Sequence, residues 1–213
     1  VFFPGPKNNW VRNKYGWGDR LILLYAGTHG VSHNLDKLLD LAKMLLDYPD
    51  IRIVLIGGGS QKPSLIKKAK QFGLNNVQFI DTQPREKMRD FINASDVCIA
   101  ILQKLDCFKL VHPGKVFDYL SCGKPVLIAI DGLARELVKN ACAGLYADPE
   151  NSKELKEAVL QFYNDREFLR RCGMNGFRYI TRNYSREVIQ REYLAALLNT
   201  IYEHKSDKLK RNN

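Results

Sequence analysis

The chain has 213 residues, with 33 Lys+Arg against 23 Asp+Glu, so its formal net charge at pH 7 is +10. Hydrophobic residues make up 45% and charged residues 26%. These shares exclude a wholly disordered chain, a collagen-like chain and a disulfide-stapled mini-protein. The length suits one sizeable α/β core, and two full domains are not expected.

The cysteines and the apolar runs indicate in which cellular compartment the chain is expected. The five cysteines are odd in number and no pair has the CxxC spacing, so we expect reduced thiols, no zinc site and no disulfide framework. No signal peptide is visible, and the longest apolar runs, residues 21–26 and 126–130, are far too short to span a bilayer. We therefore expect a cytoplasmic chain. Because it starts at Val rather than Met, we also expect it to be a piece of a longer protein.

In chain order, residues 1–20 are rich in Pro, Gly and Asn, which predicts an interdomain linker or an entry segment of the domain. Short apolar runs rich in β-branched residues then alternate with segments of helical spacing. The expected strands are residues 21–26, 51–56, 77–80, 97–102 and 126–130, with a short sixth at 144–146. The expected helices between them are residues 35–46, 63–72 and 86–93, and a further one that opens near Pro113.

This alternation predicts a doubly wound, Rossmann-like parallel α/β sheet of about six strands, covered by helices on both faces. The chain then becomes helical, over residues 152–164, 166–182 and 186–202, with Ser152 and Ser185 as expected N-caps. We assign residues 21–183 to one Rossmann-like domain, 184–203 to a C-terminal helix and 204–213 to a frayed tail.

Ligands of open α/β sheets bind outside the carboxyl ends of the strands. The loop after the first strand, AGTHGVSHN, places Gly27 and Gly30 around Thr28 and His29. Free backbone N–H groups and a following helix N-terminus suit a phosphate, although a tight turn that merely needs glycine explains the loop equally. The loop lacks both the GxGxxG and the P-loop patterns. The GGG loop that contains Gly58 can likewise be a ligand-binding loop or simply a turn from strand to helix that needs glycine.

The most informative segment is HPGKVFDYLSCGKPVLIAID, residues 112–131. Pro113 and Gly114 are typical of a helix opening, and Lys115 falls in the first turn. Asp118 stands three residues later on the same helix face. A cation beside a helix N-terminus favours an anion, and Asp118 could accept hydrogen bonds from a diol such as ribose.

The same segment resembles the donor-site signature of retaining glycosyltransferases of the GT-B fold, of the large family four type. That signature is an acidic residue, seven others, a second acidic residue and then GxPV, and residues 118–126 match its second half. PGKVFDYLSCGKPV is most similar to the branch that builds bacterial surface polysaccharides from amino-sugar nucleotides. LILLYAGTHG, VLIGGGSQKPSLIKKAKQFGLNNVQFID and INASDVCIAIL also resemble that branch, so the similarity covers roughly residues 20–203.

The resemblance implies the C-terminal, donor-binding half of a two-domain glycosyltransferase, with the N-terminal acceptor domain missing. It implies retaining transfer from a nucleotide-sugar, with uracil favoured as the base, to a polysaccharide or lipid-linked acceptor, and no cofactor or bound metal. Lys115 and His29 would stabilise the leaving phosphate. The full set of expected donor-binding residues is Gly27, Thr28, His29, Gly30, Gly58, Gln83, Pro113, Gly114, Lys115, Val116 and Asp118.

Two departures from the family pattern matter. The first acidic position falls on Leu110, for which Asp106 is a conceivable substitute. The Arg and Lys that the family places in its first loop for the diphosphate fall on Thr28 and His33. The phosphate charge would then be met by Lys115, His29, backbone N–H groups and the helix dipole.

Several alternatives remain open. The first is a sugar-nucleotide 2-epimerase of related fold. The second is a non-enzymatic nucleic-acid-binding α/β domain that uses the C-terminal arginines; the sequence disfavours it because no aromatic stacking platform is apparent. The third is a flavodoxin-like regulatory domain, which would need an acidic cluster where only Asp81 stands. The basic C-terminal helices suit either a peripheral position at an anionic membrane face or a merely solvated surface. No nucleic-acid partner is expected.

Overall fold

The computed structural model describes residues 2–211, with side chains described through residue 200. The chain divides into two compact units, one reaching to Phe177 and the other beginning at Arg178. The sheet and the pockets discussed below belong to the first unit.

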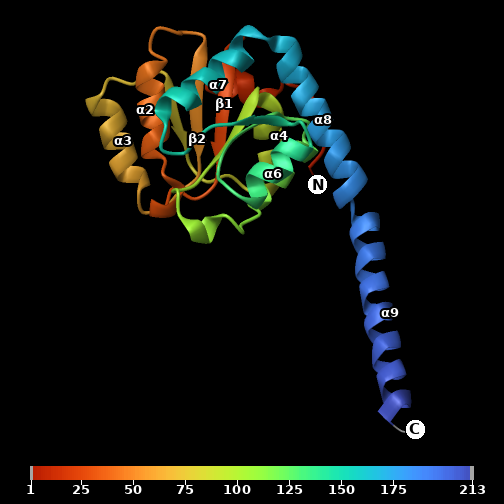
Figure 1. Cartoon of the computed structure of the whole chain (residues 1–213). Coiled ribbons are helices and arrows are strands. Elements are labelled where there is room, and N and C mark those ends of the chain that lie inside the picture. Colours follow the sequence, from red (N-terminus) through yellow and green to blue (C-terminus); the bar gives the residue numbers. More distant parts are fainter. Residues whose placement is uncertain (1, 212–213) are drawn as a thin grey trace. The chain divides into compact units, whose positions relative to one another are not determined.

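The first unit is built on one six-stranded sheet (Figure 1). The strand order is β3-β2-β1-β4-β5-β6, and all five pairings are parallel. This confirms the doubly wound, Rossmann-like prediction, with the topological switch between β1 and β4. The strands are β1 (Leu21–Ala26), β2 (Ile51–Ile56), β3 (Val77–Ile80), β4 (Val97–Ile101), β5 (Val126–Ala129) and β6 (Gly144–Tyr146).

Nine α-helices are assigned in the described part of the chain. They are α1 (Trp10–Tyr15), α2 (Asp36–Met44), α3 (Lys62–Gln71), α4 (Arg85–Ala94), α5 (Gly114–Ser121), α6 (Leu133–Asn140), α7 (Ser152–Asn164), α8 (Arg166–Tyr184) and α9 (Arg186–Arg211). The N-cap of α7 is Asn151 rather than the expected Ser152, because the Asn151 side chain accepts hydrogen bonds from the second and third helical N–H groups. Ser185 caps α9 as expected, through a 3.3 Å bond from the Val188 N–H.

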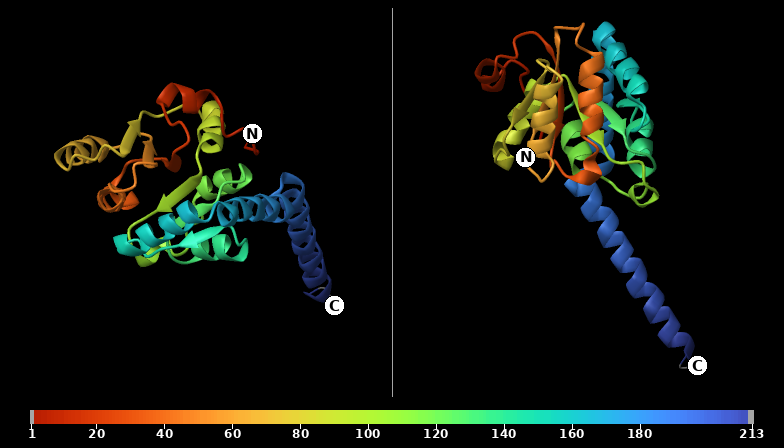
Figure 2. Two further views of the ribbon diagram at one scale, coloured as in Figure 1. Left: turned by 90° about the horizontal axis from the view of Figure 1, so that it is seen from above. Right: turned by 90° about the vertical axis from the view of Figure 1, so that its left-hand side faces the viewer.

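The sheet is buried on both faces. Leu21, Leu23 and Tyr25 of β1 pack in one apolar cluster with α2, α3 and α7. Because side chains alternate along a strand, Ile22 and Leu24 face the opposite layer, and both are fully buried. Helices on both sides of the sheet are visible from above (Figure 2). The two layers leave the ends of the strands as the places where a ligand can reach the backbone.

The amino-terminal segment, expected to be a linker or an entry segment, packs on the domain. Its described residues contain α1, which packs against α4. Trp17 is fully buried and its indole N–H donates to the Gln78 side chain at 2.8 Å. Arg12 is 4% exposed and pairs with Asp96 at 2.7 Å. Large aromatic side chains between the Pro and Gly residues therefore make this segment part of the domain's packing.

The carboxyl-terminal segment, expected to end in a frayed tail, is assigned as helix over most of its length. Helix α9 runs to Arg211, so residues 204–211 have helical backbone, and residues 212–213 lie outside the described residues. In the part of the chain that the structure describes, no helix combines the length and apolarity needed to cross a membrane.

Candidate functional site

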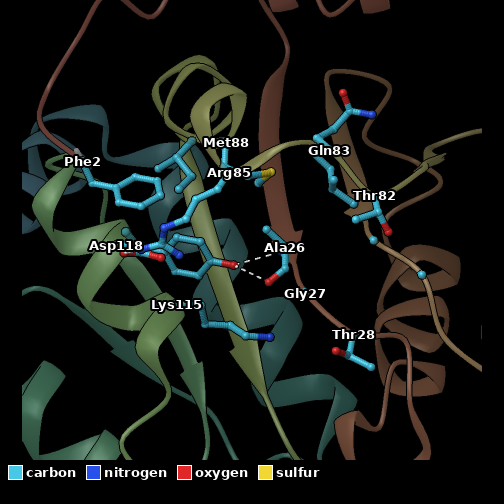
Figure 3. Close-up of a pocket in the computed structure, with 15 residues that line it drawn as sticks. Phe2, Ala26, Gly27, Thr28, Thr82, Gln83, Arg85, Met88, Lys115 and Asp118 are labelled. Carbon is cyan, nitrogen blue, oxygen red and sulfur yellow. Dashed lines mark hydrogen bonds and ion pairs between the residues drawn. The ribbon is translucent and has the colours of Figure 1, made fainter.

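A pocket of about 350 Å³ opens at the carboxyl ends of β1, β2 and β3, beside the first turns of α5 (Figure 3). This edge adjoins the topological switch point, where doubly wound sheets bind ligands. Six of the expected donor-binding residues line the pocket, which we call the carboxyl-edge pocket. They are Gly27, Thr28, Gly58, Gln83, Lys115 and Asp118.

The other five expected residues do not line this pocket, and their assignment as ligand contacts stays a prediction. Pro113 is the N-cap of α5 and Gly114 its first residue, so both place Lys115 rather than line the pocket. Val116 is fully buried in the core. Gly30 lines a different, smaller hollow beside α2. His29 is the fifth.

The side chain of His29 points into the protein rather than into the pocket. It is fully buried, lies against the rings of Tyr25 and Phe79, and neither ring nitrogen has a hydrogen-bond partner of good geometry among the described residues. Burial, with the nearby positive charge of Lys62, lowers the pKa of His29 to about 4. The imidazole is therefore neutral near pH 7 and is not exposed to the carboxyl-edge pocket in this structure, so its expected role at a leaving phosphate stays a prediction.

Lys115 is the principal cation of the pocket. Its ammonium lies 4.0 Å from the centroid of the Tyr25 ring, and it makes no hydrogen bond or ion pair with any described residue. Burial lowers the pKa of Lys115 to about 8. The ammonium approaches Gly27 so closely that a Cβ there would lie 2.6 Å from it. The first glycine loop thus makes room for the cation.

The two glycine loops are held against each other. A Cβ on Gly57 would lie 1.9 Å from the carbonyl oxygen of Gly27, so only glycine permits this approach. The N–H of His29 donates to the Gly58 carbonyl at 2.8 Å, and Lys62 donates to the Gly57 carbonyl at 2.7 Å. The backbone N–H groups of Thr28 and Gly58 have no acceptor among the described residues, which leaves two donors at the pocket wall.

Asp118 stands beside two residues that sequence reasoning missed. Arg85 of α4 approaches its carboxylate at 3.6 Å, and the guanidinium of Arg85 lies 4.9 Å from the centroid of the Phe2 ring. Figure 3 shows the three side chains grouped on one side of the pocket. Burial raises the pKa of Asp118, and the Arg85 charge opposes that rise. Nothing in the sequence around Phe2 indicates that it lies at this pocket. Arg85 could have been found, because it directly follows the loop that contains Gln83.

Tyr119 connects α5 to the end of β1. Its hydroxyl accepts a hydrogen bond from the Ala26 N–H at 2.9 Å and lies 3.3 Å from the Ala26 carbonyl oxygen (Figure 3). The sequence favours a purely apolar core role for this ring, and it is indeed 1% exposed. The hydroxyl adds a fixed link between the helix that carries Lys115 and the strand that precedes Gly27.

The residues at which this chain departs from the family pattern differ in their exposure to solvent. Leu110 is 78% exposed and does not line the carboxyl-edge pocket. Asp106 does not line it either, and pairs with Lys109 at 2.7 Å on a short 3-10 turn, η2 (Asp106–Phe108). His33 is half-buried beside Tyr25. Within the described residues, no group of three or more His, Cys, Asp and Glu side chains is arranged to hold a metal.

Comparison with known proteins gives a consistent result. A family model described as "Glycosyl transferases group 1" matches residues 9–179. A protein of Escherichia coli named as a colanic acid biosynthesis glycosyl transferase, WcaI, is 30% identical over 122 residues, which are 57% of this chain and 30% of that protein. An uncharacterized glycosyltransferase of Methanocaldococcus jannaschii is 27% identical over 165 residues, or 76% of this chain and 44% of that protein. The chain thus spans less than half the length of these curated relatives.

Solved structures show the same fold. Anabaena HepE in complex with UDP superposes with a TM-score of 0.80 at 18% identity, over 89% of this chain and 51% of that one. HepE has also been solved with UDP-glucose. The C-terminal domain of LpcC, a group 1 family glycosyl transferase of Francisella tularensis, superposes with a TM-score of 0.70 at 19% identity, over 87% of this chain and 97% of that one. The Rossmann-like half of a GT-B architecture is therefore the fold of this chain.

Proposed function

Because the chain belongs to the family of glycosyl transferases group 1, we propose that its carboxyl-edge pocket binds the nucleoside diphosphate of a sugar donor. The observation that carries this proposal is the partly buried ammonium of Lys115, which has no anionic partner among the described residues. Withdrawing an ammonium from water without a counter-charge is unfavourable. A diphosphate would supply that charge, which makes the unpaired lysine a binding group rather than a structural one.

The surrounding groups suit a diphosphate. The free N–H groups of Thr28 and Gly58 are at the pocket wall, and α5 begins at Gly114, one residue before Lys115. Backbone donors and a helix N-terminus favour phosphate oxygens. These groups take the place of the loop arginine and lysine that the family pattern expects where this chain has Thr28 and His33.

Asp118 is proposed to accept hydrogen bonds from the ribose hydroxyls. Its carboxylate lies on the same helix face as Lys115, one turn further on. The base would then lie toward Thr82, Gln83 and Met88, which line the adjoining wall. We favour uracil because HepE, which shares the fold, is solved with UDP and UDP-glucose.

For the whole protein we propose retaining transfer of the sugar to a polysaccharide or lipid-linked acceptor held by an N-terminal domain. On donor cleavage, negative charge develops on the leaving diphosphate, and Lys115 together with the α5 N-terminus would stabilise it electrostatically. We propose that this stabilisation requires no bound metal. The sugar would extend toward the loop of Leu110, where this chain lacks the carboxylate of the family pattern.

The test is calorimetric titration of the 213-residue chain with UDP, GDP, ADP and CDP, each with and without EDTA, followed by thermal melting. We expect selective UDP binding that EDTA does not alter. A ligand at about one hundred times its dissociation constant stabilises the fold by about 2.7 kcal/mol. Asp118→Asn should weaken UDP binding at least tenfold, since hydrogen bonds to a charged acceptor are worth about 1.5 to 3 kcal/mol.

Lys67→Met on α3 is the matched control, because Lys67 is exposed and does not line the pocket. It should leave UDP binding unchanged. The donor assignment fails if none of the four nucleotides binds a folded chain, or if Asp118→Asn and Lys67→Met bind UDP alike. For the full-length protein, release of UDP with inversion at the sugar C2 and no transfer would instead identify an epimerase.

A further inference from the structure

A second hollow, of about 580 Å³, lies at the opposite edge of the sheet. Its wall includes Asp96, just before β4, and Lys124, just before β5, together with the first part of α8. It therefore lies at the amino ends of the strands, whereas the donor pocket lies at their carboxyl ends. We call it the amino-edge pocket and define it by Lys7, Lys124, Arg166, Arg170, Met174 and Phe177.

The amino-edge pocket carries an excess of positive charge. Lys7, Lys124, Arg166 and Arg170 face only two carboxylates. One of these, Asp96, is already neutralised: Arg12 binds it from the buried side at 2.7 Å, and Lys7 pairs with it as well. The other carboxylate, Asp19, is exposed. Three of the four lining cations therefore have no carboxylate partner among the described residues.

Only one of these three cations has an evident structural role. Lys124 donates to the carbonyl oxygens of Asn93 at 2.7 Å and Ser95 at 2.9 Å, where α4 ends and its carbonyls lack helical partners. Arg170, by contrast, makes no hydrogen bond, ion pair or ring contact with any described residue, and Arg166 only lies over the Tyr163 ring, at 5.3 Å from its centroid.

The two arginines also oppose each other. They stand four residues apart on α8, so they share one face of the helix, where like charges are unfavourable. Neither arginine forms an ion pair with a carboxylate among the described residues. Apart from the contact of Arg166 with the Tyr163 ring, no described partner engages this pair, and the pair is suited to an external anion.

An apolar surface continues the same helix face. Met174, one turn beyond Arg170, is 51% exposed, and Leu169 and Phe177 are partly exposed in the same wall. A small inorganic anion would use the cations alone, whereas an amphiphilic anion would use both surfaces. Adjacent basic and apolar side chains are the combination that binds anionic lipid interfaces.

We propose that the amino-edge pocket binds the phosphate of an anionic membrane lipid, with Arg166 and Arg170 on the phosphate and Met174 against the acyl boundary. Guanidinium groups suit phosphate because they can donate two parallel hydrogen bonds. Since the donor pocket is at the other edge of the sheet, a chain bound in this way keeps its carboxyl-edge pocket free of the lipid surface.

The test measures partitioning of the 213-residue chain onto phosphatidylglycerol–phosphatidylcholine vesicles and onto phosphatidylcholine vesicles, with inorganic phosphate titrated in a separate arm. We expect binding to the mixed vesicles only. Arg166→Ala and Arg170→Ala should each weaken it about fivefold, corresponding to about 1 kcal/mol per basic side chain at an anionic surface. Met174→Gln should weaken vesicle binding and leave any phosphate binding unchanged.

Lys67→Ala removes one exposed charge far from this pocket in the fold and should have a much smaller effect. If Lys67→Ala weakened vesicle binding as much as Arg170→Ala does, the binding would depend on net charge alone. That result would overturn the proposed site. Absence of wild-type binding to the mixed vesicles would also overturn it. Phosphate binding that needs Arg170, without vesicle binding, would reassign the pocket to a soluble phosphate. UDP binding by each variant checks its fold independently.

Discussion

The ammonium nitrogen of Lys115 lies over the ring of Tyr25, 4.0 Å from its centroid, while the Tyr25 hydroxyl donates to the Thr28 carbonyl at 2.8 Å. One aromatic side chain thus holds both the cation of the donor pocket and the loop beside it. A ring face stabilises a desolvated cation by about 2 kcal/mol. Burial acts in the opposite direction and lowers the pKa of Lys115 to about 8. The site is therefore organised for an anion at a cost in stability.

Replacement of Lys115 by Met should separate these two effects. The variant keeps the length and apolar body of the side chain and removes the buried charge. We expect UDP binding to be lost and the free energy of unfolding to rise by about 1 to 3 kcal/mol, since functional sites often lower stability. Urea denaturation and calorimetric titration measure the two quantities on the same sample.

The control is Lys67→Met, which should change stability by no more than about 0.5 kcal/mol, as expected for an exposed position. A Lys115→Met chain that is less stable than wild type would show that the ammonium supports the fold. In that case the unpaired cation could no longer be taken as a sign of a ligand.

The lowered pKa of Lys115 predicts a pH-dependent affinity for UDP. The protonated amine attracts the diphosphate, so UDP binding raises the pKa from its unliganded value of about 8. Between about pH 7 and this value the lysine is mostly charged and UDP keeps its full phosphate charge, so affinity changes little. Above it, binding must take up a proton, and the affinity should fall by up to about tenfold per pH unit until the pKa of the complex is reached.

Titrations between about pH 7 and pH 9, where UDP itself does not change charge, would show this decline. Lys115→Arg supplies the comparison, because a guanidinium stays charged over the whole range. Any UDP binding by that variant should not fall above pH 8. A wild-type affinity that is flat across the range would mean that Lys115 does not contact the diphosphate.

The sheet was predictable because each strand is marked by residues adjacent in sequence, namely an apolar run and the turn residues at its ends. The runs that became β1, β2 and β3 are mostly apolar and are bounded by turns, and their ends match the expected residues 21–26, 51–56 and 77–80. The segments that became β4 and β5 each end one residue before the expected boundary, because Leu102 and Ile130 already belong to the loops that leave the sheet.

The site was predictable only in part. The helix opening at Pro113 and the glycine loop identify Lys115, Asp118 and Gly27 from neighbours in sequence. Sequence cannot give the direction of a side chain in a loop, and His29 turns inward beneath Gly57. Nor could it bring Phe2 to Arg85, because that contact depends on how the amino-terminal segment follows α4.

The hydroxyl of Tyr119 offers a test of how the donor loop is positioned. β1 pairs with β4 only at Leu23 and Leu24, so the Tyr119 hydroxyl bonds Ala26 where the ladder has ended. Tyr119→Phe leaves the Ala26 N–H without this acceptor, at a cost of about 1 to 3 kcal/mol. We expect lower stability in urea and a several-fold loss of UDP affinity.

Tyr48→Phe controls for the loss of a hydroxyl, because the Tyr48 hydroxyl makes no hydrogen bond to a described residue. It should unfold as the wild type does. If Tyr119→Phe lowered stability but bound UDP with unchanged affinity, the link would be structural only and would not position the loop.

Asp96 offers a test of whether the amino-terminal segment belongs to the domain. Its carboxylate accepts hydrogen bonds from Arg12 at 2.7 Å and from the Ile22 N–H at 2.9 Å. The side chains of Arg12 and Asp96 are 4% and 5% exposed. Asp96→Asn would leave the buried guanidinium of Arg12 without a counter-charge. Breaking a buried pair in this way costs about 3 to 5 kcal/mol.

Asp90→Asn is the matched comparison, because Asp90 also holds this segment, through the Trp10 indole at 2.7 Å, but at a more exposed position. It should cost about 1 kcal/mol. Adding Arg12→Met to Asp96→Asn should recover much of the loss, since the uncompensated charge is then gone. Equal denaturation midpoints for Asp96→Asn and Asp90→Asn would show that residues 10–20 behave as a detachable linker, because a segment packed into the core cannot lose its buried counter-ion so cheaply.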